Sequence, residues 1–154
     1  MNILFVCLGN ICRSPLLEGW ARHVAEGASR RELVFDSAGT GDWHIGQPPD
    51  PRAIAAARRH GIDIADLRAR TVRGDDFARF DLILAADRAN LDWLQRHAPA
   101  DARARVALAL AWGCDTPGAE VPDPYTGTDA DFDAVCRLAQ AVATGLLRKS
   151  AARS

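Results

Sequence analysis

The chain has 154 residues, 48% of them hydrophobic, and its 19 basic and 20 acidic side chains leave a net charge of -1. This length suits one well-formed core and is too short for two ordinary domains. The near-zero charge excludes a global field that would hold nucleic acid or an anionic membrane. We therefore expect a single domain with neither nucleic acid nor a membrane as partner.

The cysteines and the start of the chain indicate a reducing compartment. The four cysteines are too sparse for a disulfide framework, and no second close pair completes a zinc site. The first apolar run is only a few residues long, and no stretch approaches the ~18 apolar residues of a membrane-spanning helix. Free thiols and a cytoplasmic location are the expectation.

The chain opens with an expected strand over residues 2–7. Its apolar run Ile3 to Val6 has the length and the β-branched and aromatic content of an interior parallel strand. The next element is expected to be a helix with Ser14 as its N-cap and Pro15 at its first position. An apolar stripe continues this helix to about Gly27.

A second strand is expected over residues 33–37, and three glycines mark residues 38–46 as a long exposed loop. Asp50-Pro51 repeats the signal for a helix start. This helix is predicted to run through Arg59 and to stop at His60-Gly61, where Gly suits a left-handed C-cap.

The second half of the chain alternates in the same way. Residues 80–86 form a nearly continuous apolar run typical of a strand covered on both faces. The other expected elements are a helix over 88–97, a fourth strand over 104–110, a Pro-rich and Gly-rich loop over 113–127, and a last helix whose apolar stripe runs from Phe132 to Leu147.

Four strands alternating with helices predict an α/β fold, with a parallel sheet covered on both faces and right-handed crossovers. In such sheets, ligands bind beyond the carboxyl ends of the strands. Cys7, the loop around Trp43, Asp87 and the loop 113–127 all emerge at that edge.

The loop after the first strand has the composition of an anion site with a nucleophile. Its backbone N–H groups, if curled around one centre, make an anion nest at the start of the helix, where Cys7 is favoured as a thiolate. Gly9 and Asn10 tolerate left-handed backbone, and Arg13 can fork two donors onto two oxygens. The expected phosphate-binding residues are Leu8, Gly9, Asn10, Ile11, Cys12, Arg13 and Ser14.

A proton donor for the leaving group must come from elsewhere in the chain. Asp123 is the candidate, because Pro122 and Pro124 fix the backbone on either side of its carboxylate. Such rigidity is costly in a loop without a function.

Two motifs resemble the low-molecular-weight protein tyrosine phosphatases. They are Val-Cys-x-Gly-Asn-x-Cys-Arg-Ser-Pro over residues 6–15 and Asp-Pro-Tyr over residues 123–125, and further matches follow in the right order over nearly the whole chain. The resemblance implies a four-stranded parallel sheet in the order 2-1-3-4. It also implies hydrolysis of phosphomonoesters through a phosphocysteine intermediate, without a metal or other cofactor.

From the same resemblance, Cys7 attacks phosphorus, Arg13 binds the equatorial oxygens, and Asp123 protonates the leaving phenolate before acting as a base toward water. The Ser14 hydroxyl would stabilise the thiolate as it leaves, and Asn10 would hold the loop. The implied partners are a phosphotyrosine-containing protein as substrate and inorganic phosphate as product. The phosphatase domain is expected over residues 1–149 of a monomer or weakly self-associating chain, with a flexible tail at 150–154.

The resemblance also assigns residues around the cleft. Trp43 and Tyr125 would wall it and favour a flat aryl ester, although packing within its own loop explains Trp43 equally well. Cys12 would be the redox partner of Cys7, forming a reversible disulfide that switches activity off under oxidation. Two other nearby residues have structural interpretations, Asp87 as an N-cap and His44 as a loop residue.

The chain departs from the family pattern at several positions. Tyr125 is followed by Thr126 rather than a second aromatic residue, so a switch on paired tyrosines is not expected. Leu67 stands where some members have a histidine behind the loop, which predicts that Asn10 and Ser37 lack one partner. Gly19 stands where alanine is usual and would loosen the first helix by ~1 kcal/mol.

Three rival functions fit parts of the pattern. An arsenate reductase on this fold needs an additional redox cysteine pair near the third strand, and residues 60–100 contain no cysteine. A non-catalytic phosphate-binding module has no reason to keep both Cys7 and Asp123. A nucleotide-binding domain needs a Gly-rich loop of another pattern at the first strand, and that pattern is missing.

Overall fold

Four parallel strands form the central sheet of the computed structural model, which describes residues 1–151. The strands are β1 (Asn2–Cys7), β2 (Val34–Gly39), β3 (Leu82–Ala85) and β4 (Arg105–Leu108). Their order is β2-β1-β3-β4, which confirms the order that the resemblance implies. Cys7 pairs with Gly39, and its neighbour Val6 pairs with Ala85, so the carboxyl ends of the central strands meet at one edge.

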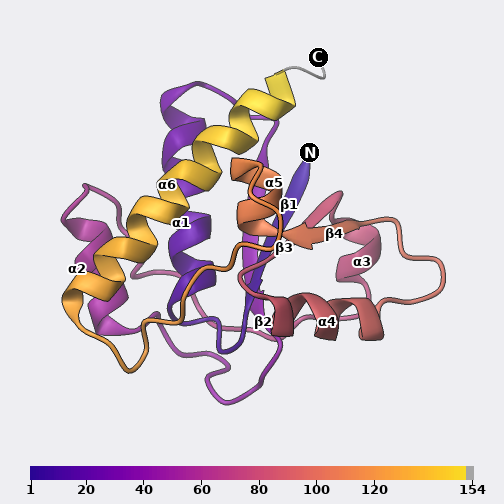
Figure 1. Ribbon diagram of the computed structural model, residues 1–154, viewed down its shortest axis with the longest axis horizontal. Helices are drawn as coiled ribbons and strands as arrows, with labels where there is room; N and C mark the ends of the chain where they lie inside the picture. The colour runs from indigo at the N-terminus through magenta and orange to yellow at the C-terminus, as the bar shows by residue number, and fades with distance from the viewer. Residues whose placement is uncertain (152–154) are drawn as a thin grey trace.

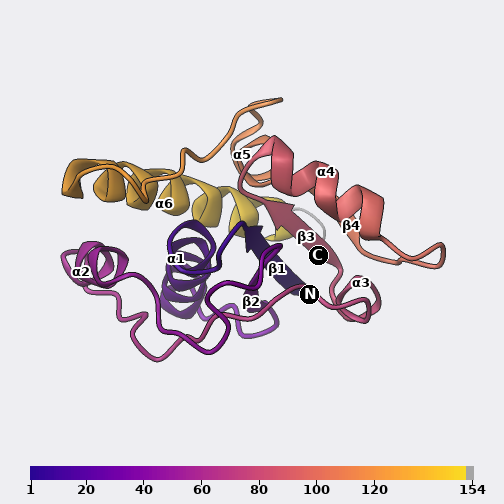
Figure 2. The same ribbon diagram turned by 90° about the horizontal axis from the view of Figure 1, so that it is seen from below.

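Six helices occupy residues 1–151: α1 (Arg13–Gly27), α2 (Pro51–Arg58), α3 (Asp76–Arg79), α4 (Arg88–His97), α5 (Ala109–Cys114) and α6 (Asp129–Ala151). Figures 1 and 2 show α1, α2 and α6 to one side of the sheet and α3 and α4 to the other. Ile3 and Phe5 of β1 pack into the core beneath α1, α5 and α6, whereas Leu4 and Val6 face Phe77 and Leu94. The side chains of β1 thus alternate between two cores, as a strand covered on both faces requires.

The first helix starts two residues earlier than the Ser14 N-cap predicts. Cys12 occupies the cap position, its side chain makes no capping hydrogen bond, and the first helical bond runs from the Leu16 N–H to the Cys12 carbonyl. Pro15 lies in the first turn, where a helix has no use for its N–H. The prediction of Ser14 as an N-cap is therefore wrong, and its hydroxyl is available to the active site.

The fourth strand is shorter than the predicted 104–110, because the chain turns into α5 at Ala109. This apolar run is rich in Ala and Leu, and apolar content alone does not distinguish a buried strand from a buried helix. The helix at Asp50-Pro51 is confirmed, with the Asp50 carboxylate accepting from the Arg52 N–H at 2.8 Å. Gly61 has a φ of 77°, which confirms the left-handed conformation at the end of that helix.

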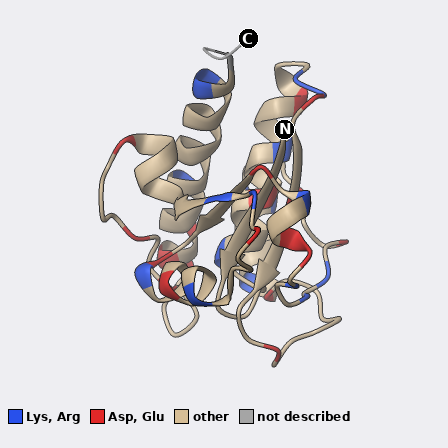
Figure 3. Ribbon diagram, turned by 90° about the vertical axis from the view of Figure 1, so that its right-hand side faces the viewer, with Lys and Arg blue, Asp and Glu red and all other residues tan. Residues whose placement is uncertain are grey.

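Acidic and basic residues are mixed over the face that Figure 3 turns to the viewer. Within residues 1–151, no helix has the length and apolar character needed to cross a membrane. The last helix extends to Ala151, and residues 152–154 of the expected tail lie outside the described residues.

Candidate active site

A cavity of about 190 Å³ opens at the carboxyl edge of the sheet. It brings together the three residues predicted to carry the chemistry, Cys7, Arg13 and Asp123. Its lining is completed by Leu8, Gly9, Ile11, Cys12, Trp43, His44 and Tyr125. Segments more than a hundred residues apart in sequence therefore share one site.

Cys7 is the last residue of β1 and is 2% exposed. Its Sγ lies 3.0 Å from Oγ of Ser14. The same Oγ accepts a hydrogen bond from Nδ2 of Asn10 at 2.8 Å. Because Asn10 supplies the hydrogen of that bond, the Ser14 hydroxyl keeps its own hydrogen and can donate it to the sulfur.

Asn10 holds the loop through all the polar atoms of its side chain. Its φ of 57° is left-handed, as predicted, whereas Gly9 does not have a positive φ. Its Nδ2 also donates to Oγ of Ser37 at 3.0 Å, and its Oδ1 accepts from the Arg70 N–H at 3.0 Å. A residue with three fixed partners constrains the strained turn of the loop.

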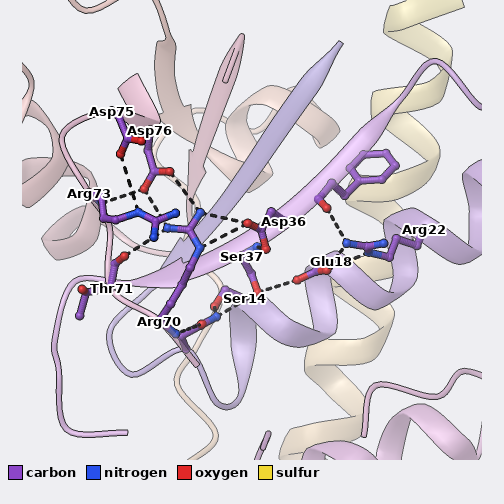
Figure 4. Close-up of polar contacts among 12 residues, drawn as sticks. Ser14, Glu18, Arg22, Asp36, Ser37, Arg70, Thr71, Arg73, Asp75 and Asp76 are labelled. Carbon is purple, nitrogen blue, oxygen red and sulfur yellow. Dashed lines mark hydrogen bonds and ion pairs between the residues drawn. The ribbon is translucent and has the colours of Figure 1, made fainter. Parts of the chain in front are cut away.

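The predicted missing partner of Ser37 is not missing, because Glu18 of α1 replaces it. Oγ of Ser37 donates to Oε1 of Glu18 at 2.7 Å, and Arg22 donates to Oε2 of the same carboxylate at 2.8 Å. Figure 4 shows Ser37 between Ser14 and Glu18. Burial raises the pKa of Glu18, and the hydrogen bonds from Ser37 and Arg22 oppose that rise. With Leu67 in place of the family's histidine, Ser37 therefore still has its hydrogen-bond partners behind the loop.

Arg70 fixes the segment that supports Asn10. Its guanidinium reaches between Asp36 at 3.0 Å and Asp76 at 2.9 Å, as Figure 4 shows. The Asp76 side chain is fully buried, and its charge is compensated by Arg70 and by the Arg73 N–H at 2.8 Å. A buried carboxylate needs such partners, so the segment is held firmly.

Arg13 is oriented by Asp87, which sequence reasoning placed only as an N-cap. Asp87 does cap α4, accepting from the Asn90 N–H at 2.9 Å. Its other oxygen lies 2.7 Å from Nη1 of Arg13, which also donates to the Val121 carbonyl at 3.1 Å. The available signal was its place at the carboxyl end of β3, the strand beside β1.

Asp123 lies across the cavity from the loop. Its side chain is 49% exposed, and its Oδ2 is 3.9 Å from Nη2 of Arg13. Its Oδ1 accepts from the Tyr125 N–H at 3.1 Å. A carboxyl at the mouth of an anion site, close to the cation that would hold the anion, can exchange protons with a bound ester.

Comparison with known proteins agrees with this geometry. A family model described as low molecular weight phosphotyrosine protein phosphatase matches residues 2–153. The chain belongs to this family. A low molecular weight phosphotyrosine protein phosphatase of Sus scrofa is 42% identical over 137 residues, covering 87% of this chain and 85% of the pig protein.

Two further comparisons extend over nearly the whole phosphatase. A low molecular weight protein-tyrosine-phosphatase of Streptomyces coelicolor is 41% identical over 150 residues, covering 95% of this chain and 91% of its own. The crystal structure of a protein tyrosine phosphatase from Entamoeba histolytica superposes with a TM-score of 0.92 at 33% identity, covering 99% and 97% of the two chains. Fold and family therefore agree.

Exposed aromatic residues flank the phosphatase cavity. Trp43 is 65% exposed and Tyr125 is 50% exposed, and both line the opening. His44, interpreted from sequence as a structural residue, lines the cavity as well, with its Nδ1 3.0 Å from Oε1 of Gln47. Its position directly after Trp43 was the signal that could have placed it there.

Cys12 lines the same cavity but differs from Cys7 in its surroundings. Burial and the nearby carboxylate of Asp50 raise the pKa of the Cys12 thiol, with Cys7 and Asp123 adding to the rise. The Cys12 thiol therefore ionises less readily than an ordinary cysteine thiol. The disulfide between Cys7 and Cys12 stays a prediction, and both are free thiols here.

Within residues 1–151, no group of three or more His, Cys, Asp and Glu side chains is arranged to hold a metal ion. The polar groups of the cavity are instead those of an anion site. Cation, thiol and carboxyl are each in place for chemistry on a bound phosphate ester.

Proposed function

We propose that this phosphatase hydrolyses aryl phosphomonoesters, with phosphotyrosine in proteins as the substrate class, through a phosphocysteine on Cys7. The observation that carries this proposal is the convergence of Cys7, Arg13 and Asp123 on one cavity. A binding module would need the cation, but it would need neither a thiol beneath the anion nor a carboxyl above it.

In the first step, the loop N–H groups and Arg13 hold the equatorial oxygens of the phosphoryl group. The Cys7 thiolate attacks phosphorus, the bond from phosphorus to the phenolic oxygen breaks, and Asp123 gives its proton to that oxygen. The products are a neutral phenol, an ionised Asp123 and an S-phosphorylated Cys7. Asp87 keeps Arg13 aimed at the anion throughout.

In the second step, Asp123 accepts a proton from water while the water oxygen attacks phosphorus. The bond from phosphorus to sulfur breaks, inorganic phosphate forms, and Cys7 returns as a thiolate. The hydroxyl of Ser14, 3.0 Å from the sulfur, donates to the charge that develops there. Asp123 then leaves the cycle protonated, ready for the next ester.

Trp43 and Tyr125 support an aryl ester as the substrate, because flat side chains at the mouth stack well on a phenyl ring. We expect the enzyme to act in the cytoplasm as a monomer or weakly self-associating chain. A peroxide would oxidise the Cys7 sulfur to a sulfenic acid, from which the Cys12 thiol would displace water to form a disulfide. Turnover would stop until a thiol reduces that bond.

The test is hydrolysis of a phosphotyrosine peptide by the wild type, Cys7→Ser and Asp123→Asn. We expect Cys7→Ser to be inactive and Asp123→Asn to lose about 10²–10⁴ in kcat/KM. Full activity of Cys7→Ser would overturn the mechanism. A phosphoarginine peptide should be run beside it, because an arginine phosphatase from Drosophila superposes with a TM-score of 0.91 at 27% identity. Preference for phosphoarginine would contradict the proposed substrate class.

A further inference from the structure

Arg52, the second residue of α2, reaches from its helix to the loop that carries Asp123. Its Nη2 donates to the Tyr125 carbonyl at 2.8 Å, and its Nη1 donates to the Gly127 carbonyl at 3.4 Å. Both carbonyls lie just after Asp123 in the chain. The guanidinium of Arg52 therefore binds two carbonyls of the turn that follows Asp123, the proposed general acid.

The hydrogen bond from Arg52 to Tyr125 is connected to Asp123, the proposed general acid, through the Tyr125 peptide. The N–H of Tyr125 donates to Oδ1 of Asp123 at 3.1 Å, and the carbonyl of Tyr125 is the group that Arg52 binds. One residue therefore holds the carboxylate through its N–H while Arg52 holds that residue through its carbonyl. A shift of Tyr125 would therefore alter the hydrogen bond that its N–H donates to the Asp123 carboxylate.

The guanidinium of Arg52 is itself fixed on several sides. Asp50 pairs with it at 3.0 and 3.1 Å, and its central carbon lies 4.7 Å from the ring centroid of Phe132, which is fully buried. It also lies 5.7 Å from the ring centroid of Tyr125. A cation held by a carboxylate and two rings loses little further freedom when it binds the loop.

The pair Asp50 and Arg52 also connects the loop that carries Asp123, the acid loop, to the loop over residues 8–14, the phosphate loop. The N–H of Asp50 donates to the carbonyl of Ile11, inside the loop that would cradle phosphate. The pair Asp50 and Arg52 thus bridges the two segments whose separation sets the distance from the bound ester to the acid. On its other side, the acid loop is tied down by Val121, whose N–H donates to the Ala86 carbonyl at 2.8 Å.

We propose that Arg52 is a positioning residue for proton transfer, which fixes Asp123 over the phosphate loop through the Tyr125 peptide. This inference rests on the proposed function, because it concerns how the acid of that mechanism is placed. Arg52 is not among the residues that line the cavity, so it is not placed to contact a bound phosphoryl group. Its contribution should therefore appear only where the proton from Asp123 matters.

The experiment compares Arg52→Met with Arg59→Met. Arg59 flanks the same helix and pairs with Asp133 of α6 at 2.7 Å, so the control also loses an ion pair but leaves the acid loop untouched. Both variants are assayed for kcat/KM on phenyl phosphate, whose leaving group needs a proton, and on 2,4-dinitrophenyl phosphate, whose leaving group does not. Thermal unfolding of each variant records whether the fold is kept.

We expect Arg52→Met to lose about tenfold in kcat/KM on phenyl phosphate and less than about threefold on the dinitrophenyl ester, a fraction of what a general acid supplies. Arg59→Met should match the wild type on both. Arg52→Lys should recover little, because an ammonium cannot fork onto two carbonyls. An equal loss on both esters, or no loss on phenyl phosphate, would overturn the assignment.

A double variant separates this inference from the proposed function. If Arg52 acts through Asp123, then adding Arg52→Met to Asp123→Asn should change kcat/KM on phenyl phosphate by less than about twofold, since coupled residues are not additive. A further tenfold loss in the double variant would contradict the positioning role. If Asp123→Asn alone retained wild-type rates, the proposed mechanism itself would fail instead.

Discussion

The direction of hydrogen bonds around Asn10 determines what Ser14 can do. Both hydrogens of the Asn10 amide are used, one by Ser14 and one by Ser37, while its oxygen is taken by Arg70. The Ser37 hydroxyl donates to Glu18, and the Ser14 hydroxyl keeps its own hydrogen, which it can donate to the Cys7 sulfur 3.0 Å away. Ser14 can thus donate to the sulfur at one end of this chain, while Ser37 donates to the buried Glu18 carboxylate at the other.

Replacing Ser14 by alanine removes the donor to the sulfur. A hydrogen bond to a charged group is worth ~1.5–3 kcal/mol, so we expect kcat to fall about tenfold or more. The fall in kcat/KM should be smaller, because the donor is needed most when the thiolate leaves phosphorus. Steady-state kinetics on an aryl phosphate measures both quantities. Equal effects on kcat and kcat/KM would contradict a role in the second step.

Asp87→Asn tests the orientation of Arg13. The Arg13 side chain is 4% exposed, so removing the charge of Asp87 leaves a buried cation with only the Val121 carbonyl and the more distant Asp123 to orient it. We expect kcat/KM to drop about tenfold and competitive inhibition by inorganic phosphate to weaken, whereas Asn still caps α4. Asp92→Asn, on the exposed side of the same helix, is the control. Unchanged phosphate binding in Asp87→Asn would contradict this role.

At the scale of elements, sequence reasoning succeeded where one local signal decided the outcome. The Asp50-Pro51 start of α2 and the left-handed Gly61 that follows its end at Arg58 are local features, and both are confirmed. The start of α1 was misplaced because the Ser14 hydroxyl lies against Asn10 and the Cys7 sulfur instead of capping the helix. The short helix α5 was missed because its apolar run fits a buried strand equally well.

The packing of α5 on α6 depends on two glycines. A Cβ on Gly145 would lie 1.7 Å from the Gly113 carbonyl oxygen, and backbone cannot yield as a flexible side chain does. We expect Gly145→Ala to lower the free energy of unfolding by ~1–3 kcal/mol or more, measured by urea denaturation. Gly27→Ala is the matched control, because its Cβ would meet nothing within 4 Å. A Gly145→Ala protein as stable as the wild type would contradict this packing.

At the scale of the whole molecule, the sheet order and the site were predictable together. Parallel strands deliver their following loops to one edge, so Cys7, Arg13 and Asp123 could be placed there by motif and topology. The roles of Glu18 and Arg52 were not predictable, because each depends on long-range contacts that no local pattern encodes. Asp87 and His44 each had a signal in the sequence, at the carboxyl end of β3 and directly after Trp43, but both were interpreted as structural residues.

The four cysteines should differ sharply in reactivity. Burial raises the pKa of Cys12, Cys114 and Cys136, so at neutral pH each carries less of the thiolate that reacts with alkylating agents. Brief treatment with iodoacetamide, followed by peptide mapping, should label Cys7 first, and inorganic phosphate should protect it. Faster labelling of Cys12 than of Cys7 would contradict this ranking.

Trapping the covalent intermediate tests the central claim most directly. Asp123→Asn should be mixed with an aryl phosphate carrying radioactive phosphorus, quenched in denaturant within the first turnover, and digested for peptide mapping. The phosphocysteine mechanism predicts label on the peptide containing Cys7, and none when Cys7→Ser is treated in the same way. Label on another residue, or phosphate released with no labelled peptide at any quench time, would contradict the mechanism.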